Sequence, residues 1–576
     1  MKRKYEGTTR DKYGNVLADA TVAVYLSDTS GAANIYLDAD SDVAVTGTTS
    51  DTYGRYKFFV STWDYDQDQT FKILISKTDY TTLTIDNITI EDVVEQAFAV
   101  SADKTVSTQV YVPKGTTITV AAAKTLTFSG QFSAGRYTIF DGAGTVTFTG
   151  NVDEIYPEWW GATGDGTTDD ATALQAALTA SNGRHCKLAP KTYASSTTLT
   201  YPGDDTVLSG VRGATKLLFT AATDGITIPD LYATAGVAID HVILEDLEIQ
   251  TSKSTGGKAI MCDFTDYGSG HHIIRNVTAT VSGSGKWEYG LYGINFQVSD
   301  IYSLVLFQSF TTGIYLGDDC NALRFYGVDI DAGVVGLATS RGIDIANTAS
   351  SADSQWFGGC LQGYFADSCI RINPGASRMY GFHIENTNTT PADGADIVLA
   401  SDTTTQKASF TGFQGGSYIS VAQAYKIVIA DCETDAITWS ATSQDNTVKD
   451  CKVSGTYTDN GYRDKRLGCV DSSGEGLADL LGQHVAFGAD DATPSVAKGN
   501  IFHTYNGNNT TITDFDDGAE GQRIIVYIAD AKTTVDFSGT NLYGNAGVDW
   551  SPTTKDWLEA VYYDGKWYCA VHDCTA

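Results

Sequence analysis

The sequence predicts an all-β protein whose main part is a parallel β-helix, a solenoid in which each coil of the chain stacks on the coil before it. Glycine, threonine and aromatic residues are abundant, while only 19% of the 576 residues are charged, and this composition favours strands joined by tight turns. Strand-like segments also recur at irregular spacings between about 205 and 455. Because no helical pattern separates these segments, the repeats suit a parallel β-helix.

The first part of the chain is predicted to form a small β-sandwich over residues 1–92. Apolar and polar positions alternate in "ATVAVYLSD" and "TFKILISKTDYTTLTI", and short strands at this close spacing are typical of sandwiches. Residues 93–157 hold further short strands separated by glycine or lysine turns. We therefore expect a β-rich neck after the sandwich.

One helix is predicted, in "EWWGATGDGTTDDATALQAAL", residues 158–178. Thr168 suits the N-cap position, and Asp169 and Asp170 would lie in the first turn, where negative charge complements the helix dipole. One face is apolar at helical spacing: Ala171, Leu174 and Leu178. The open end of a solenoid exposes core and backbone groups, so we expect this helix to cap the first coil. Residues 158–204 thus hold the capping helix and the first strands of the β-helix.

The body of the β-helix is predicted over residues 205–460, followed by a separate β-domain over residues 461–576. Within a strand, alternate side chains point to opposite faces. The apolar positions predicted to face the interior include Phe325, Val328, Ile330, Phe382 and Ile384. The polar residues between them are then expected to line the outer wall of the solenoid.

The motif "WGATGDGTTDDATALQAAL" resembles the opening of the pectate-lyase-3-like β-helix found in phage tailspikes and tail fibres. "GIYLGDDCNALRFYGVDID" and "RMYGFHIENT" resemble coils of the same proteins, the latter through Gly381, His383, Glu385 and Asn386. Where such proteins often carry a glutamate in the preceding coil, "FGGCLQG" has Gln362. "DKYGNVLADATVAVY" resembles transthyretin-like or carboxypeptidase-regulatory-like modules at the start of tail fibres, and "DWLEAVYYDGKWYCA" resembles their C-terminal β-domain.

These resemblances imply a right-handed β-helix in a homotrimer that forms part of a phage tail. The N-terminal module would attach the protein to a tail or baseplate protein, and the C-terminal domain would support trimerisation or contact sugar. The partner outside the virion would be a bacterial surface glycan. Such a protein is assembled in the host cytoplasm and acts at the host cell surface.

The charge balance argues against several other partners. A formal net charge of −32 and a pI near 4.4 disfavour nucleic acid, because phosphate binding needs a basic surface. No window is apolar enough for membrane insertion, and no apolar stretch follows the basic residues at the start, so we expect no signal peptide. The ten cysteines form no CxxC pair, and "DADSD" has Val43 where a calcium loop needs glycine, so we expect no cofactor and no metal.

Outward carboxylates supply the candidate catalytic residues. Adjacent coils of a β-helix lie about 4.8 Å apart, and paired carboxylates separated by about 5 Å or about 6.5–9.5 Å catalyse glycosidic hydrolysis. One carboxyl must stay protonated while the other is ionised. Glu385 with Asp344 is the first candidate pair, His383 is an orienting or proton-transferring group, and Asp329 is a further candidate carboxylate.

Aromatic residues beside charged ones supply the candidate substrate-binding residues, since sugar rings stack on aromatic faces. The candidates are Trp287, Glu288, Tyr289, Tyr292, Arg324 and Trp356. Trp287 and Trp356 suit a glycan surface or packing in the core or a trimer contact equally well, because aromatic residues anchor both.

The sequence therefore predicts a phage tailspike that binds and depolymerises a capsule or O-antigen polysaccharide by glycosidic hydrolysis. Three alternatives stay open: a polysaccharide lyase acting by β-elimination, a receptor-binding fibre without enzymatic activity, and a cellular or secreted pectate-lyase-like enzyme. The lyase would need a base near a uronic acid whose carboxylate is neutralised, often by Ca²⁺. Arg324, Arg371 and Arg378 are candidates for that role.

Overall fold

The structure is a computed structural model. It describes residues 2–27, 29–39, 41–66, 69–90, 97–230, 239–264, 270–308, 310–333, 339–346, 353–372, 376–389, 391–393, 395–399, 408–415, 418–421, 427–439, 445–455, 457–459, 465–471, 473–474, 484–496 and 500–574. The chain divides into two compact units, Met1–Met261 with His271–Gly285 and Cys262–Gly270 with Lys286–Ala576. Each unit has its own internal order of strands.

The first unit begins with two antiparallel sheets that share one core, as the sequence predicts. The strands are β1 (Lys2–Thr8), β2 (Thr21–Leu26), β3 (Gly47–Thr49), β4 (Arg55–Ser61), β5 (Thr70–Ser76) and β6 (Leu83–Thr89). One sheet pairs β1 with β4, and the other has the order β3-β2-β5-β6. Val22, Phe58, Phe71 and Ile73 lie together in the core, so alternation in each strand places the apolar face inward.

The neck is a small parallel solenoid. Its strands are β7 (Ala97–Val100), β8 (Lys104–Val106), β9 (Val110–Val112), β10 (Thr117–Val120), β11 (Thr125–Phe128), β12 (Phe132–Ala134), β13 (Phe140–Asp141) and β14 (Thr145–Phe148). The orders β13-β10-β7, β14-β11-β8 and β12-β9 are all parallel. Phe128, Phe132, Phe140 and Phe148 pack together inside it. The chain thus begins to coil well before the predicted first strand.

The predicted helix is present but starts later than expected. The 3-10 helix η1 (Pro157–Trp160) and strand β15 (Asp165–Asp169) precede helix α1 (Ala171–Ala180), so the prediction of Thr168 as N-cap was wrong. Asp170 is the N-cap instead, and Asp169 ends β15, where it accepts a hydrogen bond from the Ala171 backbone N–H at 3.1 Å, so neither lies in the first turn as predicted. The predicted apolar stripe is buried, and α1 contacts η1, β14 and β18 (Leu199–Thr200). The helix therefore lies between the neck and the first coils of the main solenoid.

Asp170 is buried, with 2% of its surface exposed, and its hydrogen bonds stabilise the segment before α1. Its carboxylate accepts backbone hydrogen bonds from Thr163 at 2.7 Å and Gly164 at 3.0 Å. We expect Asp170→Ala to lower the free energy of unfolding by about 1–3 kcal/mol, because these donors lose their acceptor. The denaturation midpoint measures this loss. The exposed Asp153 provides the control, since Asp153→Ala should stay within about 0.5 kcal/mol of the wild type.

Parallel coils continue through the rest of the first unit. The strands are β16 (His185–Lys187), β17 (Thr192–Ser195), β19 (Val207–Ser209), β20 (Lys216–Phe219), β21 (Ile226–Pro229), β22 (Ile243–Thr251), β23 (Lys258–Asp263) and β24 (Ile273–Val281). One sheet runs β15-β17-β20-β22-β24, and a second runs β18-β21-β23. Each strand pairs in parallel with the corresponding strand of the next coil, which confirms the predicted solenoid.

The second unit holds most of the solenoid. Its strands are β25 (Trp287–Ile294), β26 (Asp300–Tyr302), β27 (Val305–Phe307), β28 (Phe310–Gly317), β29 (Leu323–Asp331), β30 (Thr339–Ala346), β31 (Asp353–Gly363), β32 (Phe365–Ile372), β33 (Ala376–Asn386), β34 (Ile397–Leu399), β35 (Ser409–Thr411), β36 (Tyr418–Val421), β37 (Val428–Ala430), β38 (Glu433–Thr434), β39 (Ala436–Trp439), β40 (Thr447–Lys449), β41 (Lys452–Val453), β42 (Tyr457–Asp459) and β43 (Lys465–Leu467).

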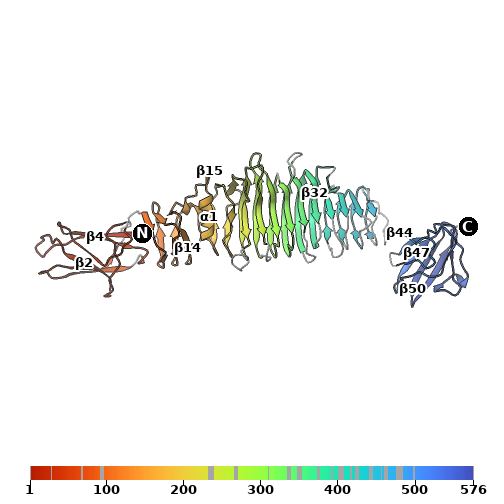
Figure 1. The fold of residues 1–576 in the computed structure, drawn as a ribbon, viewed down its shortest axis with the longest axis horizontal. Helices are drawn as coiled ribbons and strands as arrows, with labels where there is room; N and C mark the ends of the chain where they lie inside the picture. The colour runs from red at the N-terminus through yellow and green to blue at the C-terminus, as the bar shows by residue number, and fades with distance from the viewer. Residues whose placement is uncertain are drawn as a thin grey trace. The chain divides into compact units, whose positions relative to one another are not determined.

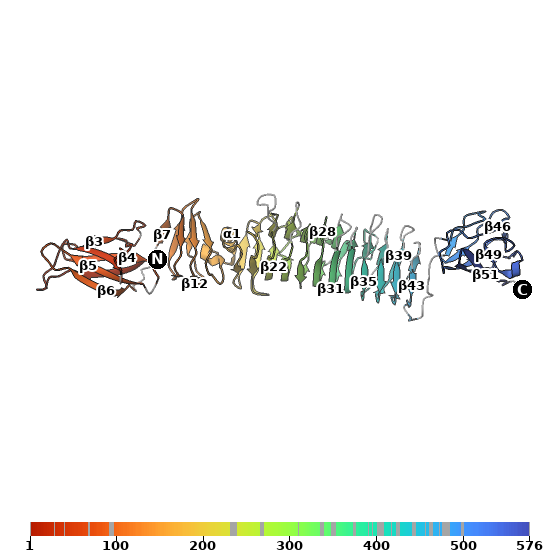
Figure 2. The same cartoon turned by 90° about the horizontal axis from the view of Figure 1, so that it is seen from below.

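Two long parallel sheets of this unit carry the candidate site. The first sheet has the order β26-β29-β31-β33-β35-β37-β40-β43, and the second has the order β25-β28-β30-β32-β34-β36-β39-β42. Figure 1 and Figure 2 show these strands as successive arrows lying side by side. Because β43 still pairs in parallel with β40, the solenoid extends past the predicted boundary at residue 460.

A left-handed residue bends the first sheet once in each coil. These residues are in register from strand to strand and have positive φ: Ser303, Gly327, Gly358, Gly381 and Gly412. The bend takes one residue out of the alternation, so that Phe325 and Val328 both face inward although two residues separate them. The predicted inward positions are confirmed, since Phe325, Val328, Ile330, Phe382 and Ile384 are all at most 1% exposed.

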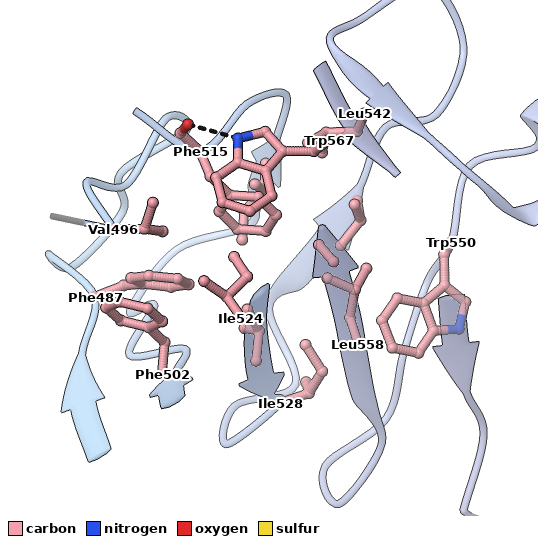
Figure 3. Packing of buried hydrophobic residues seen from close by; sticks show 14 of the residues in the cluster. Phe487, Val496, Phe502, Phe515, Ile524, Ile528, Leu542, Trp550, Leu558 and Trp567 are labelled. Atoms are coloured by element: carbon pink, nitrogen blue, oxygen red, sulfur yellow. Dashed lines mark hydrogen bonds between the residues drawn. The ribbon is translucent and has the colours of Figure 1, made fainter. Parts of the chain in front are cut away.

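The C-terminal domain has its own core, shown in Figure 3. Its strands are β44 (His484–Ala486), β45 (Ile501–His503), β46 (Thr510–Ile512), β47 (Arg523–Tyr527), β48 (Thr533–Val535), β49 (Leu542–Tyr543), β50 (Trp557–Tyr563) and β51 (Lys566–His572), with the short 3-10 helix η2 (Asn545–Gly547). The main sheet has the order β44-β45-β47-β50-β51-β49. Trp567 is fully buried and donates its indole N–H to the Phe515 carbonyl at 2.9 Å. In the described parts of the chain, no helix is long and apolar enough to cross a membrane.

Candidate functional site

The predicted catalytic residues lie on two different sheets of the second unit. Asp344 is on β30 of the second sheet, where its register partners are Tyr315 and Arg371. Glu385 is on β33 of the first sheet, where it pairs with Gln362. The prediction that Glu385 and Asp344 form an adjacent pair was therefore wrong. The chain turns a corner between the two sheets, so similar positions in successive strands along the sequence do not share a wall.

Asp344 lies beside a cluster of three tyrosines. Tyr289 and Tyr292 are on β25 and Tyr315 is on β28. The Tyr292 and Tyr315 rings stack with centroids 5.2 Å apart and an angle of 11° between their planes. Tyr289 completes the cluster at 5.0 Å from Tyr292 and 5.5 Å from Tyr315. We call these three residues the tyrosine cluster. They are half-buried, so part of each side chain remains exposed to solvent.

The Asp344 carboxyl is buried, with 7% of the residue exposed. Burial raises its pKa, because the charged form loses hydration, although the nearby Arg341 and Arg371 oppose the shift. Its Oδ2 lies 3.6 Å from Nη1 of Arg341. Its Oδ1 is buried and accepts no hydrogen bond from any residue that the structure describes. Asp344 thus has a pKa shifted toward the protonated form and one oxygen without a hydrogen bond from a described residue.

Arg341 joins Asp344 to two further carboxylates. It donates to Asp393 from Nε at 3.0 Å and from Nη2 at 3.1 Å, and its Nη2 lies 3.6 Å from Asp367. Ser368 also donates to Asp393 at 3.0 Å. Burial alone would raise the pKa of Asp393, but the hydrogen bonds from Arg341 and Ser368 outweigh it and lower that pKa. The site thus combines a carboxyl whose pKa is raised with one whose pKa is lowered.

The tyrosine cluster is held in its protonated form. Burial raises the pKa of Tyr289 and of Tyr315, and the negative charges of Glu288 and Asp344 respectively add to the effect. Burial raises the pKa of Tyr292 to about 12. These phenols therefore remain hydrogen-bond donors at neutral pH, a state that suits contact with sugar hydroxyls.

The other three predicted catalytic residues are Asp329, His383 and Glu385, and all three follow the bend of the first sheet. Asp329, Cys360 and His383 are in register on β29, β31 and β33. Nε2 of His383 lies 3.8 Å from Oε2 of Glu385, and both side chains are more than half exposed. Burial raises the pKa of Asp329. We call Asp329, Cys360, His383 and Glu385 the corner cluster; the side chain of Glu385 is more than half exposed, so Glu385 is a weaker candidate for the general acid than the buried Asp344.

The two predicted tryptophans are in the core. Trp287 and Trp356 are both fully buried, so their prediction as glycan-binding residues was wrong. The alternative, that they pack in the core, is confirmed. The Trp356 ring stacks on Phe325 with centroids 3.7 Å apart, and its indole N–H donates to Ser354 at 2.8 Å. Each points inward because its position in the strand alternation falls on the interior face. Arg324, by contrast, lies on the outer face and pairs with Asp300.

Sequence reasoning missed Arg341, Asp367, Asp393 and Tyr315. Asp393 follows a proline in "PADGAD", a loop pattern that predicts a turn and not a site. Only the register of β28, β30 and β32 brings these residues together. In the described ranges, no group of three or more His, Cys, Asp or Glu side chains is arranged to hold a metal ion.

Comparison with known proteins gives no family match. Neither a protein-family profile nor a curated protein matches the chain, so the resemblance to pectate-lyase-3-like proteins stays a prediction. Among solved structures, the ORF18 protein of Geobacillus virus E2 is 12% identical, with 72% of this chain and 71% of that chain covered and a TM-score of 0.40.

Two other solved structures show a likeness of the same order. Tailspike protein 2 of Escherichia coli O157:H7 bacteriophage CAB120 is 12% identical, with 74% of this chain and 63% of that chain covered and a TM-score of 0.32. The catalytic unit of a GH87 α-1,3-glucanase from Streptomyces thermodiastaticus is 12% identical, with 83% and 90% covered and a TM-score of 0.32. At these TM-scores the likenesses carry no argument about what this chain does.

Proposed function

We propose that this chain binds a bacterial surface polysaccharide and hydrolyses its glycosidic bonds at the surface formed by the tyrosine cluster, Asp344 and Arg341. The observation that carries the proposal is the state of Asp344. Its carboxyl is buried, its pKa is raised, and one of its oxygens is uncommitted beside a surface of tyrosine rings. Glycosidic hydrolysis needs a carboxyl that can hold and donate a proton next to the leaving oxygen, and a raised pKa shifts Asp344 toward that form.

Each residue of the site has its own role in the proposed hydrolysis. Asp344 donates its proton to the glycosidic oxygen as the bond to the leaving sugar breaks and positive charge develops on the ring. Asp393, whose pKa is lowered by Arg341 and Ser368, is the second carboxylate: it takes a proton from the water whose oxygen forms the new bond to the anomeric carbon. The tyrosine cluster holds the sugar chain through ring contacts and phenol hydrogen bonds. Arg341 acts as a positioning residue, because it fixes the carboxylates relative to one another.

The pKa of Asp344 determines the expected pH profile. Only the protonated form donates, so kcat/KM should fall as pH rises through the raised pKa of Asp344. The midpoint of this fall in kcat/KM should lie at a pH above the ordinary pKa range of an aspartate. The fall should be absent in Asp344→Asn. Reducing-end assays across pH measure it. A midpoint at the ordinary aspartate pKa would contradict the assignment.

A single screen tests the reaction. The purified full-length protein is incubated with panels of capsule polysaccharides and lipopolysaccharides, and each mixture is scored for new reducing ends and for unsaturated uronic products. We expect reducing ends without unsaturated products from at least one glycan. If every glycan is bound or ignored without being shortened, the hydrolase proposal is wrong.

One observation favours β-elimination as a second candidate. Arg341 and Arg371 both lie near Asp344, where guanidinium groups could neutralise the carboxylate of a uronic acid. Against it, the three phenols have raised pKa values and are poor bases at neutral pH. Unsaturated products in the screen above would decide for elimination.

We also propose the setting that the sequence resemblance implies: a phage tail component that assembles as a homotrimer and attaches to the tail or baseplate through its N-terminal module. The antiparallel sandwich formed by β1 to β6 supports the comparison with attachment modules. Light scattering of the purified protein should give the mass of three chains. A monomeric mass would contradict the trimer and would leave the proposed hydrolysis to be judged by its own screen.

A further inference from the structure

A row of four aromatic rings runs along the outer face of the first sheet, away from the tyrosine cluster. Tyr302, Tyr326, Phe357 and Tyr380 are in register on β26, β29, β31 and β33. Consecutive rings stack nearly parallel, with centroids 4.8, 5.1 and 5.4 Å apart and angles of 7°, 12° and 10° between their planes. We call this the aromatic row. It repeats once in each coil.

A second row of polar side chains lies two residues earlier in the same strands. Asp300, Arg324, Gln355 and Arg378 are in register there. Arg324 pairs with Asp300, and Arg378 lies 3.3 Å from Asp353, so the charges of this row are balanced within the chain. The row therefore offers planar hydrogen-bonding groups without a net charge that would favour an ionic ligand.

The opposite flank of the aromatic row is open. Gly327, Gly358 and Gly381 follow three of the rings, and a Cβ added at any of them would meet nothing within 4 Å. A ligand can thus reach the ring edges and the glycine backbone from that side. The result is a strip with an apolar row in the middle, hydrogen-bonding groups on one flank and bare backbone on the other.

The exposed area of the aromatic row favours a glycan over a second copy of the chain as its ligand. Phe357 and Tyr380 are 36% and 37% exposed, and Tyr302 and Tyr326 are less exposed. At about 150–250 Å² for each ring, the row offers roughly 300 Å². A stable interface needs about 800 Å² from each partner. A narrow, regularly repeating strip suits a linear polymer better than a folded surface.

We propose that the aromatic row is a second glycan-binding site, separate from the tyrosine cluster, that holds an extended, uncharged polysaccharide along the direction in which the coils stack. Sugar rings contact the partly exposed aromatic rings, while their hydroxyl groups bond to Arg324, Gln355 and Arg378 and to the phenols of the row. The inference does not depend on the proposed hydrolysis, because a binding strip needs no catalytic residue.

Affinity electrophoresis tests it. The full chain carrying Asp344→Asn, which the proposed hydrolysis expects to cleave far more slowly, migrates through native gels that contain dextran, laminarin, hydroxyethyl cellulose or the anionic polymer alginate. We expect at least one neutral polymer to retard it and alginate to retard it less. Replacing Tyr326, Phe357 and Tyr380 together with alanine should weaken the retardation roughly tenfold or more, since three ring contacts are lost.

Two further variants keep the test decisive. Tyr13, Tyr53 and Tyr111 are exposed aromatic residues elsewhere, and their joint replacement with alanine should leave retardation unchanged. Gly358→Asn keeps every ring but places a side chain beside Phe357, and it should weaken binding even if the triple variant folds poorly. The proposal is overturned if no neutral polymer retards the protein, if the triple variant binds as the parent does, or if that variant loses oligomeric mass instead.

Discussion

Replacing Asp344 with asparagine is expected to lower the rate of polysaccharide cleavage by about 10²–10⁴-fold, the usual contribution of a positioned general acid. The amide has nearly the same shape but cannot donate a carboxyl proton. Because Asp344 is buried and its Oδ1 accepts no hydrogen bond from a described residue, we expect the substitution to lower kcat and to change KM little. Reducing-end release from the glycan identified in the screen measures the loss.

Two variants show whether the loss belongs to Asp344. Glu433→Gln removes a carboxylate on a later coil, where Glu433 pairs with Lys452 at 2.7 Å, and should leave cleavage unchanged. Glu385→Gln tests the corner cluster, which the sequence favours. Should Glu385→Gln abolish cleavage while Asp344→Asn retains it, the reaction takes place at the corner cluster and our assignment is wrong.

Replacing Trp356 with alanine is expected to lower the free energy of unfolding of the solenoid by about 3–5 kcal/mol. The side chain is fully buried, stacks on Phe325 at 3.7 Å and donates to Ser354. Its removal leaves a cavity that the coils above and below cannot fill without shifting. The midpoint of chemical unfolding, followed by near-ultraviolet circular dichroism, measures the change.

Phe357 is the matched control for Trp356, because it follows directly in the same strand but faces outward. Phe357→Ala should cost about 1 kcal/mol or less, the usual value for an exposed cross-strand contact. Equal losses at both positions would mean that the inward and outward faces of β31 are not as described. The comparison also separates the structural role of Trp356 from the glycan contact that its residue type suggests.

Much of the fold could be predicted because it rests on local patterns. The alternation that places Phe382 and Ile384 inward and His383 outward is a property of any strand, and the apolar stripe of α1 is a property of any amphipathic helix. The start of α1 was harder to predict. Asp169 ends strand β15 and accepts a hydrogen bond from Ser196, while Asp170 is the N-cap and accepts hydrogen bonds from Thr163 and Gly164, so neither lies in the first turn of the helix.

The candidate site could be predicted only in part, because it depends on register between coils. Tyr289, Tyr292 and Asp344 were singled out from residue type, but their meeting with Tyr315 and Arg341 requires the pairing of β25, β28 and β30. Glu385 was paired with the wrong partner for the same reason. A one-residue slip in the pairing of a strand with the next coil would give every side chain of that strand another neighbour or turn it to another face.

By itself, the sequence determined the strand alternation that turns Phe325, Phe382 and Ile384 inward and the parallel stacking of the central coils. The tertiary structure alone decided which carboxylates meet. Burial and charge depend on neighbours from other coils: the raised pKa of Asp344 comes from the residues packed around it, and the lowered pKa of Asp393 comes from Arg341, more than fifty residues earlier. Strand alternation is a local property, whereas a pKa is set by whatever the fold places alongside.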